Sequence, residues 1–338
     1  MNTVYSCDAI ILGKLTRETI INRNKEIFID QPGGNLLYTA YGFKVWGKTA
    51  GLVSRIGCDY PDEWIEEIAK NSLSVKGISK APNNSDSRSY LMVDDNNKVV
   101  ESNLQKYFSE HNLQFPKALL GYESNPVNTD NRKQGSDFTV RPENIPEEYF
   151  DSRYLALCPV DFLTHNMIPA FFRSQTGGEV FIHASHGYTH SSFFYDFPSL
   201  INGSALLLIS EENAKRLFLG KSEDTWIIAE TLASYGVEII IISNKTEGYD
   251  FFDNNSKKKL HIPSYPVSCI DPIGVDDAFF GGFLAGYLSN FDPVYASTIG
   301  SVTASVKYEG STPRYLLGTL YDLLQARVDF LREKVEII

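Results

Sequence analysis

A series of short apolar runs from residue 154 onward most constrains the fold of this chain. Segments long enough to form helices separate these runs, which cover residues 154–158, 180–182, 205–209 and 237–242. A strand of a parallel sheet is buried on both faces and reads as a continuous apolar run, while the connecting helices cover the sheet. The run at 9–13, which ends at a glycine, has the same character. The pattern predicts an α/β fold with a central, mostly parallel sheet and helices on both faces.

The size and composition of the chain are those of a globular protein. Its 338 residues, 43% of them hydrophobic, suit a single large α/β domain over residues 1–338 with an appended small sheet. The formal net charge of -11 argues against a nucleic-acid-binding surface. The four cysteines show no paired spacing, the N-terminus has no basic stretch before an apolar one, and no apolar run approaches the ~20 residues of a membrane span. We therefore expect a cytoplasmic protein without nucleic-acid or membrane partners.

The stretch 270–283 combines a glycine turn with the start of a helix. It reads as an extended segment, a turn around Gly274 and a helix that opens near Asp276 or Asp277. A helix start carries unpaired backbone N–H groups and a partial positive charge, so this turn can hold a phosphate with a carboxylate beside it. That arrangement suits phosphoryl transfer, although aspartate is also a favoured cap of an ordinary helix.

This stretch resembles the second signature of the ribokinase-like (PfkB) family of sugar and nucleoside kinases, D-T-x-G-A-G-D before an apolar, glycine-containing helix. The resemblance implies that Asp277 is the catalytic base. It places Gly274, Val275 and Asp276 at the anion hole, and it implies ATP and Mg²⁺ as cofactors with a small-molecule acceptor. Asp276 replaces a glycine of the family, and its carboxylate would repel the γ-phosphate, point away from it or help to hold a cation.

A glycine pair near the N-terminus resembles the first family signature, G-G-x-x-x-N-x-A. Gly33 and Gly34 match the pair, and glycines let the backbone approach a ligand, though they also form plain turns. Tyr38 replaces the asparagine that binds substrate in relatives, which predicts a different acceptor specificity. The resemblance also places Glu18 toward the acceptor, where most family members carry aspartate. A solvated loop carboxylate is the alternative for Glu18.

Strand-like segments within residues 14–32 and 84–107 are implied to form a β lid over the acceptor. In the family such a lid is often also a dimer surface, which makes it the candidate contact of a homodimer. Arg88 lies in one of these strands and either reaches the acceptor or a phosphate, or is a solvated edge charge. Residues 101–146 are rich in Asn, Asp, Ser and Gln with few periodic apolar positions, and we predict an irregular insertion there.

Two further segments are implied to contact the nucleotide. Ser210 and Asn213 align with the family's N-x-x-E motif around magnesium and phosphate, so the motif's glutamate is missing; a helix N-cap begun by Ser210 is the alternative. Ser243, Lys245 and Gly248 take the place of the family's nucleotide loop, T-x-G-x-x-G. Lys245 either meets the ATP phosphates or is solvated.

The C-terminal part of the chain completes the resemblance. Gly310 lies in a turn similar to the one that borders the adenine in the family. The segment 316–334 has an amphipathic pattern, which predicts a helix packed on the sheet.

Three histidines follow one of the apolar runs. His183, His186 and His190 have a spacing that would suit a metal if they lay on a helix. The intervening residues favour a loop, and no carboxylate or cysteine stands at a matching spacing, so we predict no metal site. We expect these side chains to line the nucleotide side of the cleft or to be exposed.

The resemblance leads to one function and one alternative. The function is ATP-dependent phosphoryl transfer to a hydroxyl of a sugar, polyol or nucleoside, with Asp277 as general base. The alternative is a ligand-binding or regulatory module that keeps the fold with weakened catalysis. The departures at Tyr38, Ser210, Asn213 and Asp276 motivate this alternative.

Overall fold

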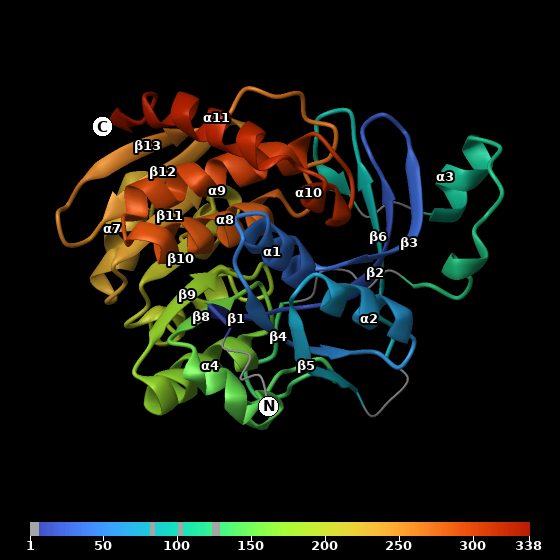
Figure 1. Ribbon diagram of the computed structural model, residues 1–338, viewed down its shortest axis with the longest axis horizontal. Coiled ribbons are helices and arrows are strands. Elements are labelled where there is room, and N and C mark those ends of the chain that lie inside the picture. The colour runs from blue at the N-terminus through green and yellow to red at the C-terminus, as the bar shows by residue number, and fades with distance from the viewer. Residues whose placement is uncertain (1–6, 82–84, 101–103, 124–128) are drawn as a thin grey trace.

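The structure, a computed structural model, describes residues 7–81, 85–100, 104–123 and 129–338 (Figure 1). Its main sheet is built from β1 (Ala9–Leu12), β4 (Ala50–Ile56), β5 (Ser74–Lys80), β8 (Tyr154–Leu157), β9 (Glu179–His183), β10 (Leu206–Ser210), β11 (Ile239–Ser243), β12 (Gly248–Asp253), β13 (Lys259–Pro263) and β14 (Glu336–Ile337). In the described part of the chain these ten strands have the order β14-β13-β12-β11-β10-β9-β8-β1-β4-β5. The strands from β5 across to β11 are parallel, and β12, β13 and β14 continue the sheet antiparallel. The predicted mostly parallel sheet is confirmed.

Helices cover both faces of this sheet. One face carries α1 (Asn35–Lys44), α2 (Asp62–Lys70), α8 (Val275–Asn290), α9 (Pro293–Tyr308), α10 (Arg314–Leu317) and α11 (Tyr321–Arg332), and the other carries α4 (Phe162–Thr176), α5 (Phe197–Ile201), α6 (Glu211–Leu217) and α7 (Thr225–Ser234). Side chains alternate between the two faces along a strand. In β1, Ala9 and Ile11 join the core under α1 and α8, whereas Ile10 and Leu12 join the core on the other face.

A second, smaller sheet lies at one side of the molecule (Figure 1). It consists of β2 (Thr16–Ile21), β3 (Ile27–Gly33), β6 (Arg88–Val93) and β7 (Val99–Val100), in the order β3-β2-β6-β7 within the described residues. The segments 14–32 and 84–107 therefore do contribute one separate sheet, which we call the lid. Residues 84 and 101–103 of the predicted ranges lie outside the described residues.

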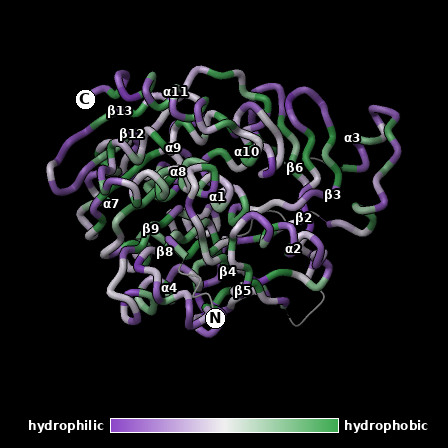
Figure 2. Tube along the Cα trace, in the orientation of Figure 1, coloured by the Kyte–Doolittle hydropathy of each residue, from purple (hydrophilic) through white to green (hydrophobic). Residues whose placement is uncertain are grey.

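The insertion is only partly irregular. It contains α3 (Leu104–Glu110), which lies beyond the lid in Figure 1, and the short 3-10 turns Lys117–Leu119 and Pro142–Asn144. The other 3-10 turns of the described chain span Glu147–Asp151, Ser191–Phe193 and Lys245–Glu247. Residues 124–128 of the predicted insertion are not described. Figure 2 shows a contrast between hydrophobic strands inside the molecule and hydrophilic outer turns, such as the loop between β12 and β13.

The helix predicted over 316–334 is wrong in its extent. The structure ends α10 at Leu317 and begins α11 only at Tyr321. Between them Leu320 adopts an extended backbone, with φ -75° and ψ 134°, which interrupts the helix. None of the helices in the described residues is both long enough and apolar enough to span a bilayer.

Helices α1 and α8 pack with their backbones almost in contact. A Cβ atom added at Gly281 would lie 2.0 Å from the main-chain oxygen of Thr39, and one added at Gly42 would lie 2.7 Å from that of Ala278. Glycine is therefore required at both positions for the helices to approach this closely. The contact fixes the start of α8, which carries Asp277, against α1, which carries Tyr38.

Candidate active site

The turn before α8 has the geometry that its sequence predicts. Gly274 adopts a left-handed backbone with φ 72° and caps the helix, and the predicted start at Asp276 or Asp277 moves to Val275. The Oδ1 atom of Asp271 accepts a hydrogen bond of 2.8 Å from the backbone N–H of Ile273, which shapes the turn. The first N–H groups of a helix have no intrahelical acceptor, so this end of α8 presents donors and a partial positive charge.

Asp277 lies in the first turn of α8 and faces the carboxyl end of β9. Its Oδ1 atom is 3.1 Å from Nδ1 of His183, and the two side chains are 15% and 9% exposed. His183 is the last residue of β9 and packs against the ring of Phe280 at 5.8 Å between ring centres. The sequence placed His183 near the nucleotide without identifying this partner.

Asp276 points toward β11. Its Oδ1 atom accepts a hydrogen bond of 2.6 Å from the hydroxyl of Ser243, the last residue of that strand. Burial raises the pKa of Asp276, and the hydrogen bond from Ser243 opposes that shift. Two residues that the sequence assigned separately, one to the anion hole and one to the nucleotide loop, are thus in direct contact.

Glu18 is not a solvated loop carboxylate. Its side chain is buried, and its two oxygens accept hydrogen bonds of 2.7 Å from the N–H of Gly34 and 2.9 Å from the hydroxyl of Tyr38. Burial raises the pKa of Glu18 to about 7, although these hydrogen bonds and one from Thr16 favour the ionised form. A Cβ atom at Gly33 would overlap the Glu18 carboxyl group, so the glycine pair makes room for this carboxylate.

Tyr38 occupies the space between Glu18 and the turn before α8. A Cβ atom added at Gly274 would lie 2.3 Å from the Tyr38 ring, so the ring rests directly on the backbone of the predicted anion hole. Burial raises the pKa of Tyr38 well above its usual value, and Glu18 adds to that shift. The Tyr38 hydroxyl therefore stays protonated and acts as a donor to Glu18.

A fully buried ion pair, which the sequence analysis missed, supports this turn from α9. Nζ of Lys307 lies 3.4 Å from Oδ2 of Asp271, and both side chains are 0% exposed. The same ammonium donates hydrogen bonds of 3.3 Å to the main-chain oxygen of Asp271 and 2.8 Å to that of Gly310. It also lies 5.5 Å from the centre of the Tyr38 ring. The one signal in the sequence was a lysine within the apolar stretch that forms α9.

The Ser210 and Asn213 segment forms a helix N-cap. The hydroxyl of Ser210 accepts a hydrogen bond of 3.2 Å from the N–H of Asn213 at the start of α6. Oδ1 of Asn213 lies 2.8 Å from Nδ1 of His186, whose ring also contacts Arg216. The alternative given for this segment, a capped helix, therefore describes its structure.

A cavity of about 620 Å³ is lined by Lys245, one of the predicted nucleotide-binding residues, and by Val275 and Asp276 of the predicted anion hole. Its walls include the lid turn, the start of α6, the loop after β11 and the start of α8, with Lys98, Glu212, Lys245, Thr246 and Asp276 among the lining residues. The side chain of Lys245 is 61% exposed and lies 3.7 Å from Glu212. Gly248 begins β12 with φ 123°, where a Cβ atom would meet the main-chain oxygen of Ile262 at 2.4 Å.

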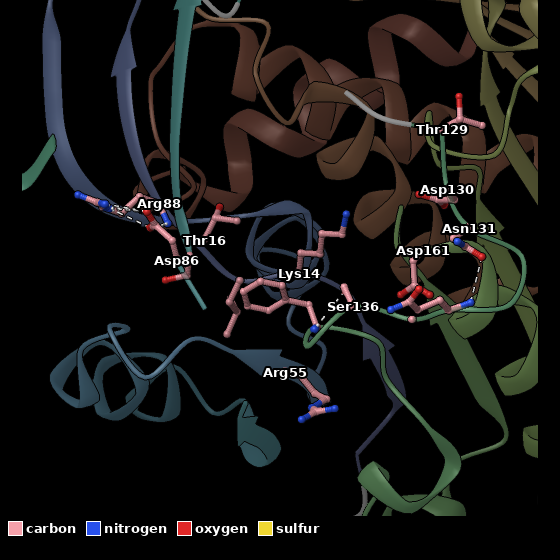
Figure 3. A pocket seen from close by; sticks show the side chains of 15 residues that line it. Lys14, Thr16, Arg55, Asp86, Arg88, Thr129, Asp130, Asn131, Ser136 and Asp161 are labelled. Atoms are coloured by element: carbon pink, nitrogen blue, oxygen red, sulfur yellow. Dashed lines mark hydrogen bonds and ion pairs between the residues drawn. The ribbon is translucent and has the colours of Figure 1, made fainter. Parts of the chain in front are cut away.

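A second cavity, of about 520 Å³, lies between the base of the lid, the end of β4 and the insertion (Figure 3). Residues 129–138 of the insertion form much of its wall, although the sequence indicated no chemistry there. Figure 3 shows Lys14 between two groups of polar side chains, with Asp130, Asn131 and Asp161 on one side and Thr16, Asp86 and Arg88 on the other. This cavity adjoins Glu18 through Thr16, whose hydroxyl hydrogen-bonds to Glu18.

Two further predicted site residues, Arg88 and Gly310, contact groups other than Asp277. The guanidinium of Arg88 binds Asp86 and the main-chain oxygens of Ala118 and Leu120, so it ties the lid to the insertion. Gly310 serves as an acceptor for Lys307, as described above.

The three histidines point to different partners. His183 meets Asp277, His186 meets Asn213, and His190 caps the 3-10 turn that follows it. Across the described ranges, no three or more His, Cys, Asp or Glu side chains gather as a metal site would require.

Comparison with known proteins agrees with this geometry. A family model described as pfkB family carbohydrate kinase matches residues 187–316. Cytidine kinase from Thermococcus kodakarensis is 23% identical over 282 residues, which cover 83% of this chain and 88% of the relative. An E. coli protein assigned as a ribokinase II, solved with ATP and Mg²⁺, superposes with a TM-score of 0.66 at 15% identity and covers 97% of this chain and 99% of its own. A nucleoside kinase from Burkholderia thailandensis, solved with inosine, gives 0.65 at 16% identity and covers 95% and 96%.

The structural likeness establishes the ribokinase-like fold, and the family model matches the segment that contains the glycine turn and Asp277. Over residues 187–316 the chain is similar to the pfkB family of carbohydrate kinases, and over most of its length it shares the ribokinase-like fold.

Proposed function

We propose that this protein transfers the γ-phosphoryl group of ATP to a hydroxyl of a sugar, polyol or nucleoside. One observation carries the proposal: Asp277 stands in the first turn of α8, beside the backbone donors of the Gly274 turn and within reach of His183. A carboxylate next to a helix N-terminus can take the acceptor's proton while the helix end stabilises charge on the phosphoryl group.

Each residue has a role in the proposed reaction. Asp277 takes the proton from the acceptor hydroxyl as its oxygen attacks the γ-phosphorus. The backbone N–H groups of Gly274 and Asp276 face the transferring group, whereas that of Val275, the third residue of the predicted anion hole, donates a hydrogen bond of 3.4 Å to the main-chain oxygen of Pro272. Glu18, whose carboxylate is held by Gly34 and Tyr38, lies on the acceptor side. When it is ionised, this carboxylate also accepts hydrogen bonds from the hydroxyls of the acceptor.

The residues around the cavity of about 620 Å³ fit ATP with Mg²⁺. Lys98 and Lys245 provide cations for phosphates, while Glu212 provides oxygen donors of the kind that Mg²⁺ and its bound waters prefer. When bound, ATP with Mg²⁺ supplies the phosphoryl group and part of the charge neutralisation.

The test is ADP release by the purified protein with a panel of pentoses, hexoses, polyols and nucleosides. Turnover should depend on Mg²⁺, and Asp277→Asn should lower it by about 10²- to 10⁴-fold, the usual contribution of a general base. Isothermal titration provides the control, because Asp277→Asn should still bind ATP with Mg²⁺. An intact protein that releases no ADP with any acceptor, or that binds ATP equally well without Mg²⁺, contradicts the proposal.

A second candidate function is a ligand-binding or regulatory module with weakened catalysis. The observation that favours it is Tyr38, whose ring packs against Gly274 at the position where the first family signature that this chain resembles has a smaller asparagine. The substitution Asp276→Gly, which restores the glycine of the family signature, separates the two functions. A large gain in turnover would mean that the Asp276 carboxylate lowers the turnover of the native site, whereas little change would favour the active kinase.

A further inference from the structure

We infer that His183 is a positioning residue for Asp277: its ring holds one carboxylate oxygen so that the other remains free to take the acceptor's proton. The inference rests on the proposed function and extends it to a residue on β9. Its basis is the 3.1 Å approach of Nδ1 of His183 to Oδ1 of Asp277.

The first step concerns the two atoms that meet. Both Nδ1 of His183 and Oδ1 of Asp277 are buried, and neither has a hydrogen-bond partner in the described chain, so their 3.1 Å approach is an ion-pair contact rather than an aligned hydrogen bond. An ionised carboxylate can only accept hydrogen bonds. The imidazole must therefore carry a proton on Nδ1, since two acceptors facing each other in a buried site would leave both unsatisfied.

The second step concerns what fixes the ring. His183 ends a central strand of the sheet, where it pairs with Leu208 of β10, and its side chain is 9% exposed. Its ring packs against Phe280, which lies one helical turn beyond Asp277 on α8. Strand and helix thus set both partners independently of the lid, which gives the rigid placement that a reacting group requires.

The third step follows the proton. In the transfer, the hydroxyl proton passes to Oδ2 of Asp277, the acceptor oxygen bonds to the γ-phosphorus, and the bond from that phosphorus to the β-phosphate oxygen breaks to release ADP. His183 neither gains nor loses a proton in this step. It restricts rotation of the carboxylate, so that Oδ2 keeps its orientation before and after protonation.

The environment of the pair contains other charged or titratable groups. Asp276 lies on the same helix as Asp277. Cys158 directly follows β8 and interacts electrostatically with Asp277, and His165 of α4 interacts electrostatically with His183. Burial lowers the pKa of His165 to about 4, so that ring is neutral. Its nitrogens contact the Cys158 carbonyl and the Tyr188 hydroxyl, and it does not compete for Asp277.

The kinetic test compares two substitutions of the same residue. Asn at position 183 can place an amide N–H near the position of Nδ1, whereas Leu cannot donate. We expect His183→Leu to lower kcat by about 10- to 100-fold with little change in the KM for ATP, and His183→Asn to recover most of that loss. In the Asp277→Asn background, His183→Leu should cause little further loss. His111→Asn, in the exposed turn that follows α3, is the matched control and should behave as wild type.

A spectroscopic test does not depend on activity. Protein labelled with ¹⁵N-histidine should give a signal, identified by its loss in His183→Asn, that reports a protonated Nδ1, and Asp277→Ala should change it. An unprotonated Nδ1 in an active kinase, or equal losses of kcat in His183→Leu and His183→Asn, overturns the inference about His183 but leaves the proposed function standing. A wild-type protein that phosphorylates no acceptor overturns the proposed function and with it the kinetic role of His183.

Discussion

The proposed acceptor side and the proposed nucleotide side of this site differ in how far their carboxylates are buried. On the acceptor side, Glu18 is 4% exposed and Tyr38 is 1% exposed, and they hydrogen-bond to each other. On the nucleotide side, Lys245 and Glu212 are 61% and 69% exposed and separated by 3.7 Å. The acceptor side is thus closed by internal packing, whereas the nucleotide side has exposed charges around a cavity. Substitutions on the acceptor side should therefore change stability, and those on the nucleotide side should change mainly binding.

The largest expected effect comes from the buried pair that supports the acceptor side. Lys307→Met leaves the Asp271 carboxylate buried without its cation, and we expect a loss of about 3–5 kcal/mol in the free energy of unfolding. Urea denaturation measures this loss. The double variant Lys307→Met with Asp271→Asn should recover much of it, because no isolated charge remains. A loss below about 1 kcal/mol in the single variant would mean that the pair contributes little to stability.

The next effect is a pH dependence of stability at Glu18. Its pKa in the folded protein is raised to about 7 from 4.5, so the folded state binds the proton more tightly than the unfolded state. This contribution to stability is therefore present at low pH and is lost as the pH rises from about 4.5 through 7. The free energy of unfolding of Glu18→Gln, taken relative to that of wild type, should therefore be about 3 kcal/mol higher at pH 8.5 than at pH 4.

Unfolding curves of both proteins at the two pH values test that expectation. Glu63→Gln, on the exposed side of α2, is the control and should follow the wild type at both pH values. If Glu18→Gln instead became less stable relative to wild type as the pH rises, the hydrogen bonds to the Glu18 carboxylate would outweigh the cost of its burial.

A smaller effect should follow from the Tyr38 hydroxyl. Tyr38→Phe removes one donor from the buried carboxylate of Glu18, which should cost about 1–2 kcal/mol at pH 8.5. At pH 5 the cost should be smaller, because a protonated Glu18 depends less on that donor. Thermal unfolding at both pH values measures the difference, with Tyr315→Phe on the surface as control. An equal loss at both pH values would argue against the coupling to Glu18.

The smallest effect should come from the nucleotide side. Asp276→Asn removes one negative charge from the cavity wall while leaving an oxygen to accept from Ser243. We expect ATP with Mg²⁺ to bind about two- to fivefold more tightly, with little change in stability. Isothermal titration measures the affinity. Weaker binding would instead favour a role for Asp276 in holding the metal.

Much of the main sheet could be predicted from its apolar runs, since a strand that is buried on both faces needs an apolar residue at nearly every position. The turn at Gly274 was also predictable, because few residue types suit a left-handed backbone before a helix. The break before Tyr321 was not, since an amphipathic pattern continues across it. The contacts of His183 and Lys307 escaped prediction because each depends on how distant elements cross. The orientation of Asp276 was left open for the same reason.

The close contact between α1 and α8 also bears on how acceptor choice can change. Gly42 and Gly281 lock together the helices that carry Tyr38 and Asp277, so neither helix can shift to suit a new substrate without losing its packing. The lid and the insertion, by contrast, reach the second cavity through turns and loops. Under the proposed function, a new acceptor is therefore most readily accommodated by substitutions in the lid and the insertion, while the packing of α1 on α8 keeps Tyr38 and Asp277 in a fixed relation.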